Sequence, residues 1–295
     1  MSKEVVSRSG QSLMIDEFTL KEMCINPSII MIAKRGSGKS WVARAILDHF
    51  NKVPVGLIIA PTDRMNPFYS TYFPSTYIHY KWDSQILEGV LSRQIKIIEK
   101  ASEKLKKGKY IDARAFIIMD DCLGRGKDWK KSEAIQELLF NGRHYQLMYI
   151  LTLQTPLGIG PDLRSNFDYV FLLATDIVTD MKKMYEHYAG MFPNLSAFKS
   201  VFSELVKDFG CMVVINRGTR SNLLEKIKWY RAPDLEDVHI KYGCKQFRTY
   251  HEKNFDKNWN KRLLKFDAEG FMDKRKNKRM GINKVSNHPK KYNDS

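Results

Sequence analysis

The chain has 295 residues, of which 43% are hydrophobic, enough to bury one substantial α/β core with an appendage. Its formal net charge of +16 favours nucleic acid as a partner, although solubility or attraction to anionic membranes would also account for it. There is no apolar run of the roughly 18 residues that span a bilayer, and no apolar signal region follows Met1, so we expect the protein to act inside a cell. The cysteines at 24, 122, 211 and 244 lack metal-ligand spacing, which argues against zinc or a disulfide framework.

Short apolar runs bounded by turn residues recur along the chain and predict buried strands. They lie at residues 28–32, 55–60, 116–119, 148–153, 169–173 and 211–215. Most are continuously apolar, which is the pattern of strands covered on both faces of a parallel sheet. The sequence therefore predicts an α/β fold in which helices flank a mainly parallel sheet.

Helical periodicity fills several of the gaps between these strands. Apolar residues share one face over residues 42–50, over a longer segment from Ser84 towards Lys107, and over residues 198–209. The last helix is expected to start after Ser196, as a side-chain cap, and to stop at Gly210, where glycine permits a left-handed turn. The lysines near Lys107 are interpreted as a solvated helix C-terminus.

A phosphate-binding loop follows the first of these strands. Residues 33–40 read Ala-Lys-Arg-Gly-Ser-Gly-Lys-Ser, and a helical pattern begins at once after them. Glycines let backbone N–H groups curl around phosphates, Lys39 is predicted to reach the β and γ oxygens of ATP, and Ser40 to ligate Mg²⁺. Ala33 stands where such loops usually have a first glycine. The predicted nucleotide contacts are Arg35, Gly36, Ser37, Gly38, Lys39, Ser40 and Trp41.

Two polar strand ends could complete this site. The strand at residues 116–119 runs into Asp120 and Asp121, of which the first would orient Mg²⁺ or its water and the second would polarise the attacking water. Without the phosphate loop, a polar strand end that caps a turn would explain the pair as well. Gln154 ends another buried strand and could sense the γ-phosphate or position water, whereas a strand-end glutamine alone is usually just exposed.

With these elements in order, the sequence resembles the DNA-packaging ATPases of nucleocytoplasmic large DNA viruses and virophages, within the FtsK/HerA superfamily of P-loop NTPases. The resemblance covers about residues 29–171. It rests on residues 33–40, Ala60-Pro61-Thr62, Asp120-Asp121, Gly142-Arg143-His144-Tyr145, Thr152-Leu153-Gln154 and Pro161-Asp162-Leu163-Arg164-Ser165-Asn166.

The resemblance implies a RecA-like sheet in which the Gln154 strand lies between the phosphate-loop strand and the Asp120 strand. It also implies a homo-oligomeric ring around double-stranded DNA, with an arginine supplied to the nucleotide of a neighbouring subunit. Arg164 is the first candidate for that catalytic arginine and Arg143 the second. Alternatively, Arg164 pairs with Asp168 and Arg143 caps the preceding helix.

The hydrophobic pattern weakens after Asp234, and eight basic residues follow between Lys274 and Lys291. We therefore predict a P-loop ATPase domain at residues 1–233 and a basic C-terminal extension at 234–295, whose tail from about residue 274 is mobile. Such a tail could bind phosphate backbones or serve as an import signal.

The functional hypothesis is an ATP-driven motor that moves double-stranded viral DNA into a capsid, with ATP and Mg²⁺ as its ligands and no other small-molecule substrate. Capsid or membrane-associated virion proteins are further expected partners, and the expected location is the host cytoplasm at viral assembly sites, with association with the virion as an alternative. One alternative is a nucleotide or nucleoside kinase that uses Asp120 or Asp121 as a base. Another is a noncatalytic, nucleotide-gated DNA-binding or scaffold protein.

Overall fold

The computed structural model describes residues 2–6, 12–122, 129, 132–220 and 222–258. The chain divides into two compact units, one that ends at Asn254 and one that begins at Phe255. The sheet, the helices and both cavities described here belong to the first unit. The basic tail predicted from about residue 274 lies outside the described residues.

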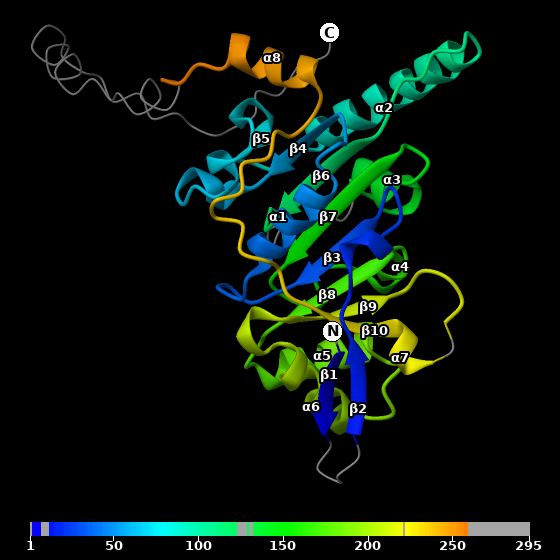
Figure 1. Cartoon of the computed structure of the whole chain (residues 1–295), viewed down its shortest axis with the longest axis vertical. Coiled ribbons are helices and arrows are strands. Elements are labelled where there is room, and N and C mark those ends of the chain that lie inside the picture. Colours follow the sequence, from blue (N-terminus) through cyan, green and yellow to red (C-terminus); the bar gives the residue numbers. More distant parts are fainter. Residues whose placement is uncertain (1, 7–11, 123–128, 130–131, 221, 259–295) are drawn as a thin grey trace, which may run out of the picture. The chain divides into compact units, whose positions relative to one another are not determined.

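An eight-stranded sheet with the order β10-β9-β8-β3-β7-β6-β4-β5 forms the centre of this unit (Figure 1). Its strands are β3 (Ser28–Ile32), β4 (Val55–Ile59), β5 (Ile78–His79), β6 (Ala115–Asp120), β7 (Leu147–Leu153), β8 (Tyr169–Leu173), β9 (Cys211–Ile215) and β10 (Ile227–Tyr230). The six predicted strands are confirmed, while β5 and β10 were not predicted. A separate hairpin joins β1 (Ser2–Val6) to β2 (Ser12–Asp16).

The strand order places β7, which precedes Gln154, between the phosphate-loop strand β3 and the Asp120 strand β6. This is the arrangement that the resemblance implied, and it is confirmed. The neighbours from β8 through β5 all pair in parallel, so the mainly parallel sheet is confirmed as well. β9 departs from that pattern because it pairs antiparallel with β8, although its residues are continuously apolar.

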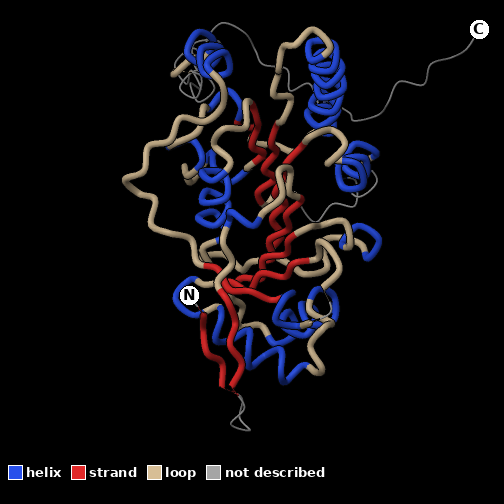
Figure 2. Tube along the Cα trace, turned by 45° about the vertical axis from the view of Figure 1, so that its right-hand side comes forward, coloured by secondary structure: helices blue, strands red, loops and turns tan. Residues whose placement is uncertain are grey.

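Helices cover both faces of the sheet (Figure 2). They are α1 (Lys39–His49), α2 (Ser84–Leu105), α3 (Glu133–Asn141), α4 (Pro161–Arg164), α5 (Val178–Tyr188), α6 (Leu195–Leu205), α7 (Leu223–Lys226) and α8 (Lys245–Asn254). Apolar residues of α1 and α8 pack into the core on one face, and those of α2, α3, α5 and α6 pack into the core on the other. Along β3, Ile30 and Ile32 face the second core while Ile29 and Met31 face the first, which explains the unbroken apolar run.

The compact unit extends beyond the predicted boundary at residue 233. Phe247 of α8 is 6% exposed and stacks on Tyr77, with ring centroids 3.8 Å apart. Tyr242 is also buried, and its hydroxyl donates a hydrogen bond to Asp48 of α1. The hydrophobic pattern is weak after Asp234 because only a few large aromatic residues there are buried. The compact unit therefore ends at Asn254 and not at the predicted boundary.

The predicted caps of α6 were wrong. The Asn194 side chain, not that of Ser196, accepts a hydrogen bond from the Ala197 N–H, at 2.8 Å. At the other end, Gly210 has an extended backbone, and the left-handed residues are Asp208 and Phe209. Glycine is required at 210 for a different reason, because a Cβ there would lie 2.2 Å from the Leu205 carbonyl oxygen.

The cysteines are free. Within the described part of the chain, no helix has both the length and the apolar character that a bilayer crossing requires.

Candidate active site

The phosphate loop runs from the end of β3 into the first turn of α1. Gly36 and Gly38 have φ angles of 75° and 89°, in the left-handed region that favours glycine, and Gly38 is the residue that precedes α1. The first N–H groups of a helix have no partner inside the helix, so the start of α1 offers donors and positive potential to an anion. The loop therefore has the local structure that phosphate binding requires.

Alanine at position 33 is compatible with this loop. The Ala33 N–H donates to the Leu153 carbonyl at 3.0 Å, and the side chain is buried in the core beneath the loop. The two loop positions with a left-handed backbone are Gly36 and Gly38. Ala33 is not among the described residues that have a left-handed backbone. The missing first glycine thus imposes no conformational cost here.

Lys39 and Asp120 meet at the carboxyl edge of the sheet. The Lys39 ammonium lies 2.9 Å from Asp120 Oδ1, and the two side chains are only 14% and 6% exposed. Lys39 is the first residue of α1 and Asp120 the last of β6, so the start of the helix and the end of the strand bring the two groups together. The pair joins the predicted phosphate-binding and Mg²⁺-orienting residues at one place.

Thr152 connects the two aspartates and is a residue that sequence reasoning missed. Its hydroxyl donates to Asp120 Oδ1 at 2.6 Å and accepts from the Asp121 N–H at 2.9 Å. Thr152 is fully buried near the end of the apolar strand β7. The available signal was a hydroxyl within an apolar strand. Because Thr152 lies two residues before Gln154, both side chains lie on the same side of the strand.

Gln154 and Asp121 also lie together. The Gln154 amide nitrogen donates to Asp121 Oδ2, which orients that carboxylate. Asp121 has a φ of 50°, an unusual backbone for a residue other than glycine. Strained backbone of this kind is concentrated at functional sites, where surrounding contacts hold it in place.

Lys39, Asp120, Asp121 and Gln154 line one cavity of about 1020 Å³. Of the seven predicted nucleotide contacts, Ser37 does not line it, because its hydroxyl donates to the Lys34 carbonyl at 2.6 Å and serves the loop itself. The others line the cavity, as do Pro61 and Thr62, which belong to the strings that carry the resemblance. The lining also includes residues that the sequence did not point to, namely Lys34, Val42, Met65, Asn66, Phe68, Phe209, Arg231, Ala232, Pro233, Asp234 and Glu236.

A tight loop that follows β4 borders the cavity. The buried carboxylate of Asp63 accepts hydrogen bonds from the N–H groups of Phe68 and Tyr69, at 2.7 and 2.6 Å. Burial, with the nearby Asp120 carboxylate second, raises the pKa of the fully buried Tyr69 well above its usual value, so its phenol stays neutral. Several aromatic residues that follow β4, such as Tyr69 and Phe73, pack into the core.

The donor set fits ATP with Mg²⁺. The glycine turns, the start of α1 and Lys39 supply the positive side, and a Cβ built on Gly36 would meet nothing within 4 Å, so the loop is open to a phosphate. Mg²⁺ usually takes one or two protein oxygens and fills its shell with phosphates and water, which matches Ser40 and Asp120. No group of three or more His, Cys, Asp or Glu in the described ranges could hold a metal ion by itself.

The two candidate arginines lie away from these groups. The Arg164 Nε donates to the Ile159 carbonyl at 3.0 Å, and its guanidinium lies 5.6 Å from the Tyr188 ring centroid. Arg143 is exposed beside a second cavity, of about 420 Å³, at the amino ends of β7 and β8, away from the carboxyl edge that holds Asp120. The structure therefore brings neither arginine to Lys39 of the same chain.

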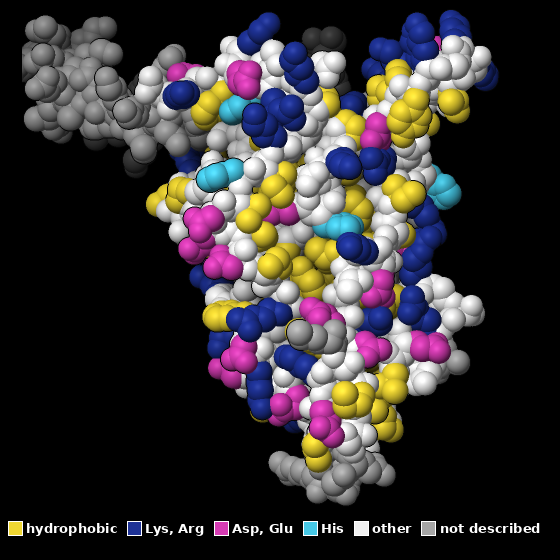
Figure 3. All heavy atoms as spheres, in the orientation of Figure 1, with side chains coloured by type: hydrophobic (Ala, Val, Ile, Leu, Met, Phe, Trp, Pro, Cys, Tyr) yellow, Lys and Arg dark blue, Asp and Glu magenta, His cyan; other side chains and the backbone are white. Residues whose placement is uncertain are grey.

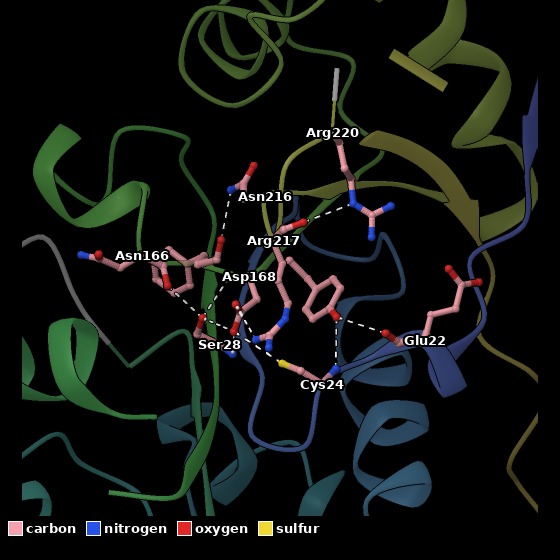
Figure 4. A network of polar contacts seen from close by, with 10 residues as sticks. Glu22, Cys24, Ser28, Asn166, Asp168, Asn216, Arg217 and Arg220 are labelled. Atoms are coloured by element: carbon pink, nitrogen blue, oxygen red, sulfur yellow. Dashed lines mark hydrogen bonds and ion pairs between the residues drawn. The ribbon is translucent and has the colours of Figure 1, made fainter. Parts of the chain in front are cut away.

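Asp168 has other partners than Arg164 (Figure 4). Its carboxylate accepts from the Ser28 hydroxyl at 2.9 Å and lies 3.5 Å from an Arg217 nitrogen. The alternative pairing of Arg164 with Asp168 is therefore wrong. The network ties the start of β3 to the start of β8, and thus supports the strand that carries the phosphate loop.

Comparison with known proteins decides the family. A family model described as Poxvirus A32 protein matches residues 16–190, which is more than half of the chain. The chain belongs to the poxvirus A32 protein family. An uncharacterized protein of Acanthamoeba polyphaga mimivirus, L437, is 48% identical over 240 residues, 81% of this chain and 84% of its own. Uncharacterized protein 088R of Invertebrate iridescent virus 3 is 32% identical over 232 residues, 76% and 84% of the two chains.

A solved structure with a TM-score above 0.5 shares the fold. The pCW3 conjugation coupling protein TcpA aligns with 81% of this chain and 68% of its own, at a TM-score of 0.52 and 13% identity. The genome packaging NTPase B204 of Sulfolobus turreted icosahedral virus 2 aligns with 72% of this chain and 99% of its own, at a TM-score of 0.48 and 16% identity. With the family match, the resemblance to proteins of large DNA viruses is confirmed.

Proposed function

We propose that this A32-family protein is an ATP-driven motor that translocates double-stranded viral DNA into the capsid during genome packaging. The observation that carries the proposal is the convergence of Lys39, Asp120, Asp121 and Gln154 at the carboxyl edge of three neighbouring strands. A phosphate loop alone would serve a switch. Two carboxylates and an amide beside it are more than a switch requires.

Each residue has a chemical task in the proposal. The start of α1 and Lys39 bind the β- and γ-phosphates, and Ser40 and Asp120 would hold Mg²⁺, which would supply neutralising charge for the transferred phosphoryl group. Asp121 accepts hydrogen bonds from the attacking water and draws its proton away. Gln154 orients Asp121, and its proposed task is to sense the γ-phosphate or to position the attacking water.

An arginine from a neighbouring subunit would complete the site in a homo-oligomeric ring. Arg143 now suits this task better than Arg164, because Arg143 is exposed whereas Arg164 is engaged by its own chain. A charge supplied across the interface stabilises the leaving phosphoryl group and makes hydrolysis depend on assembly. Capsid or membrane-associated virion proteins are the proposed docking partners, at assembly sites in the host cytoplasm.

DNA is the proposed cargo because of the chain's charge. The excess of basic residues gives a net charge of +16, and lysine and arginine side chains are spread over the visible face (Figure 3). A packaging motor must accept any sequence, so contacts to phosphates suffice and binding should weaken steeply with salt. A kinase for a small nucleoside has no need of such a surface.

Displacement of a triplex-forming oligonucleotide from the end of a long duplex tests translocation directly. We expect the full-length protein to displace the third strand with ATP and Mg²⁺, and not with a nonhydrolysable analogue. Lys39→Ala should abolish displacement, and Lys52→Ala, an exposed lysine just beyond α1, should leave it unchanged. Hydrolysis without displacement on any duplex would contradict the motor, and phosphorylation of an added nucleoside would favour a kinase.

A further inference from the structure

The segment that follows β10 passes over the phosphate-loop helix. We call residues 231–242 the strap. In Figure 1 it is the gold chain that leaves β10, runs beside α1 and reaches α8. Arg44 of α1 donates to the Val238 carbonyl at 2.9 Å, and just beyond the strap the Cys244 N–H donates to the Pro54 carbonyl at 2.7 Å. These contacts fix the strap on α1.

The first half of the strap lines the same cavity as the phosphate loop. Arg231, Pro233, Asp234 and Glu236 are all exposed and all border that cavity. Leu235, between them, is 8% exposed and packs into the core, which anchors this stretch. The cavity is thus lined both by the phosphate loop and by the strap, which is far away in the sequence.

Phe209 supplies an aromatic surface to the same cavity, beside the phosphate loop. Its ring lies 3.6 Å from the position that a Cβ on Gly38 would occupy, and the side chain is 65% exposed. Asp208 and Phe209 both have left-handed backbones, with φ angles of 53° and 61°. Two such residues in a row are costly, and the result is an exposed phenyl ring held over the phosphate loop.

Charge decides which part of a nucleotide could lie at the strap. On the strap side of the cavity, the carboxylates of Asp234 and Glu236 outnumber the one guanidinium, that of Arg231. Carboxylates repel phosphate oxygens and accept hydrogen bonds from hydroxyl and amino groups. Phosphates belong at the phosphate loop, with Lys39 and the start of α1. A nucleoside offers what the strap side can bind, namely ribose hydroxyls, amino groups and a flat aromatic base.

We propose that Phe209 and the strap form the subsite for the nucleoside part of a nucleoside triphosphate, with the base against the Phe209 ring and sugar hydroxyls or base amino groups donating to Asp234 and Glu236. The subsite rests on the proposed function, because it assumes that the loop binds the phosphates of the same molecule. It assigns a ligand-binding task to residues far beyond the phosphate motifs.

Calorimetric titration of the full-length protein with Mg-ATP and with inorganic tripolyphosphate distinguishes binding of the nucleoside from binding of the phosphates. Phe209→Ala should weaken ATP binding about 10-fold, the usual scale for loss of one base–aromatic contact, and leave tripolyphosphate binding unchanged. Asp234→Asn should likewise weaken ATP alone. Phe140→Ala, which removes another exposed phenylalanine, is the matched control and should change neither ligand.

The outcomes separate this subsite from the proposed function. Loss of both ligands in Phe209→Ala would mean that the ring only shapes the phosphate loop, and loss of neither would mean that it does not touch the nucleotide; either result overturns the subsite. Lys39→Ala should lose both ligands. Wild-type protein that binds ATP but is indifferent to Phe209 and Asp234 refutes the subsite alone, whereas wild-type protein that binds neither ligand refutes the proposed function with it.

Discussion

Thr152 positions both aspartates of the candidate site through one hydroxyl. It donates to Asp120 and accepts from the backbone of Asp121, whose left-handed conformation needs that support. Thr152→Val keeps the shape and removes both hydrogen bonds. We expect ATP hydrolysis to fall about 10- to 100-fold, the usual cost of losing a residue that orients a metal-site ligand, with little change in ATP affinity.

Thr152→Ser, which keeps the hydroxyl, is the matched variant and should restore most of the turnover. Steady-state hydrolysis together with ATP titration distinguishes this role from simple loss of folding. If Thr152→Val hydrolysed ATP at the wild-type rate, the hydroxyl would have no part in orienting the aspartates.

At the level of single residues, the sequence predicted the groups whose spacing is local. Lys39 and Ser40 belong to one loop, and Asp120 and Asp121 end one strand, so their meeting followed from the parallel sheet. Thr152, Phe209 and Asp234 could not be predicted in the same way. Their roles depend on a hydroxyl in an apolar run, on a strained turn, and on a strap whose path the local pattern does not encode.

The strap is held on α1 by a buried cluster whose charge depends on pH. Asp48 is 8% exposed, accepts from the Tyr242 hydroxyl and lies 4.0 Å from the Arg44 guanidinium. Burial raises the pKa of Asp48 to about 6 from its ordinary 3.8, against the opposing pull of Arg44. The folded state therefore disfavours the charged carboxylate.

The sign of the effect on stability follows from linkage. Between pH 4 and 6 the folded protein holds a proton on Asp48 that the unfolded chain has released, so the free energy of unfolding should fall as pH rises through this range. Asp48→Asn should remove this decline and raise the free energy of unfolding by about 3 kcal/mol at pH 8.

Urea unfolding of both proteins at pH 4, 6 and 8 measures this difference. Asp237→Asn, an exposed acid on the strap, is the control and should follow the wild-type curve. Equal stability of wild type and Asp48→Asn at pH 8 would show that the buried carboxylate costs nothing.

At the level of elements, continuous apolar runs identified six strands and the class of the sheet. They did not reveal the direction of β9, because a strand buried on both faces has the same pattern whether it runs parallel or antiparallel. The short elements β5 and α8 were not predicted for another reason. Each depends on contacts with distant residues, such as the stacking of Phe247 on Tyr77, rather than on its own periodicity.

For the whole molecule, the fold and the charge have separate tasks. The sheet gathers a phosphate loop, two aspartates and a glutamine at one edge, and the net charge of +16 lies on a chain that has relatives in several large DNA viruses. ATP chemistry and attraction to a polyanion are both needed in a motor. They should therefore be coupled: DNA should change the rate at which ATP is consumed.

Steady-state ATP hydrolysis with and without long double-stranded DNA tests that coupling most directly. We predict that DNA stimulates turnover by the full-length protein, and that Lys39→Ala and Asp121→Asn each abolish it in the same buffer. Stimulation should decline as salt rises, because DNA binding is electrostatic. Turnover that DNA leaves unchanged at low salt, or that survives both substitutions, would contradict the account.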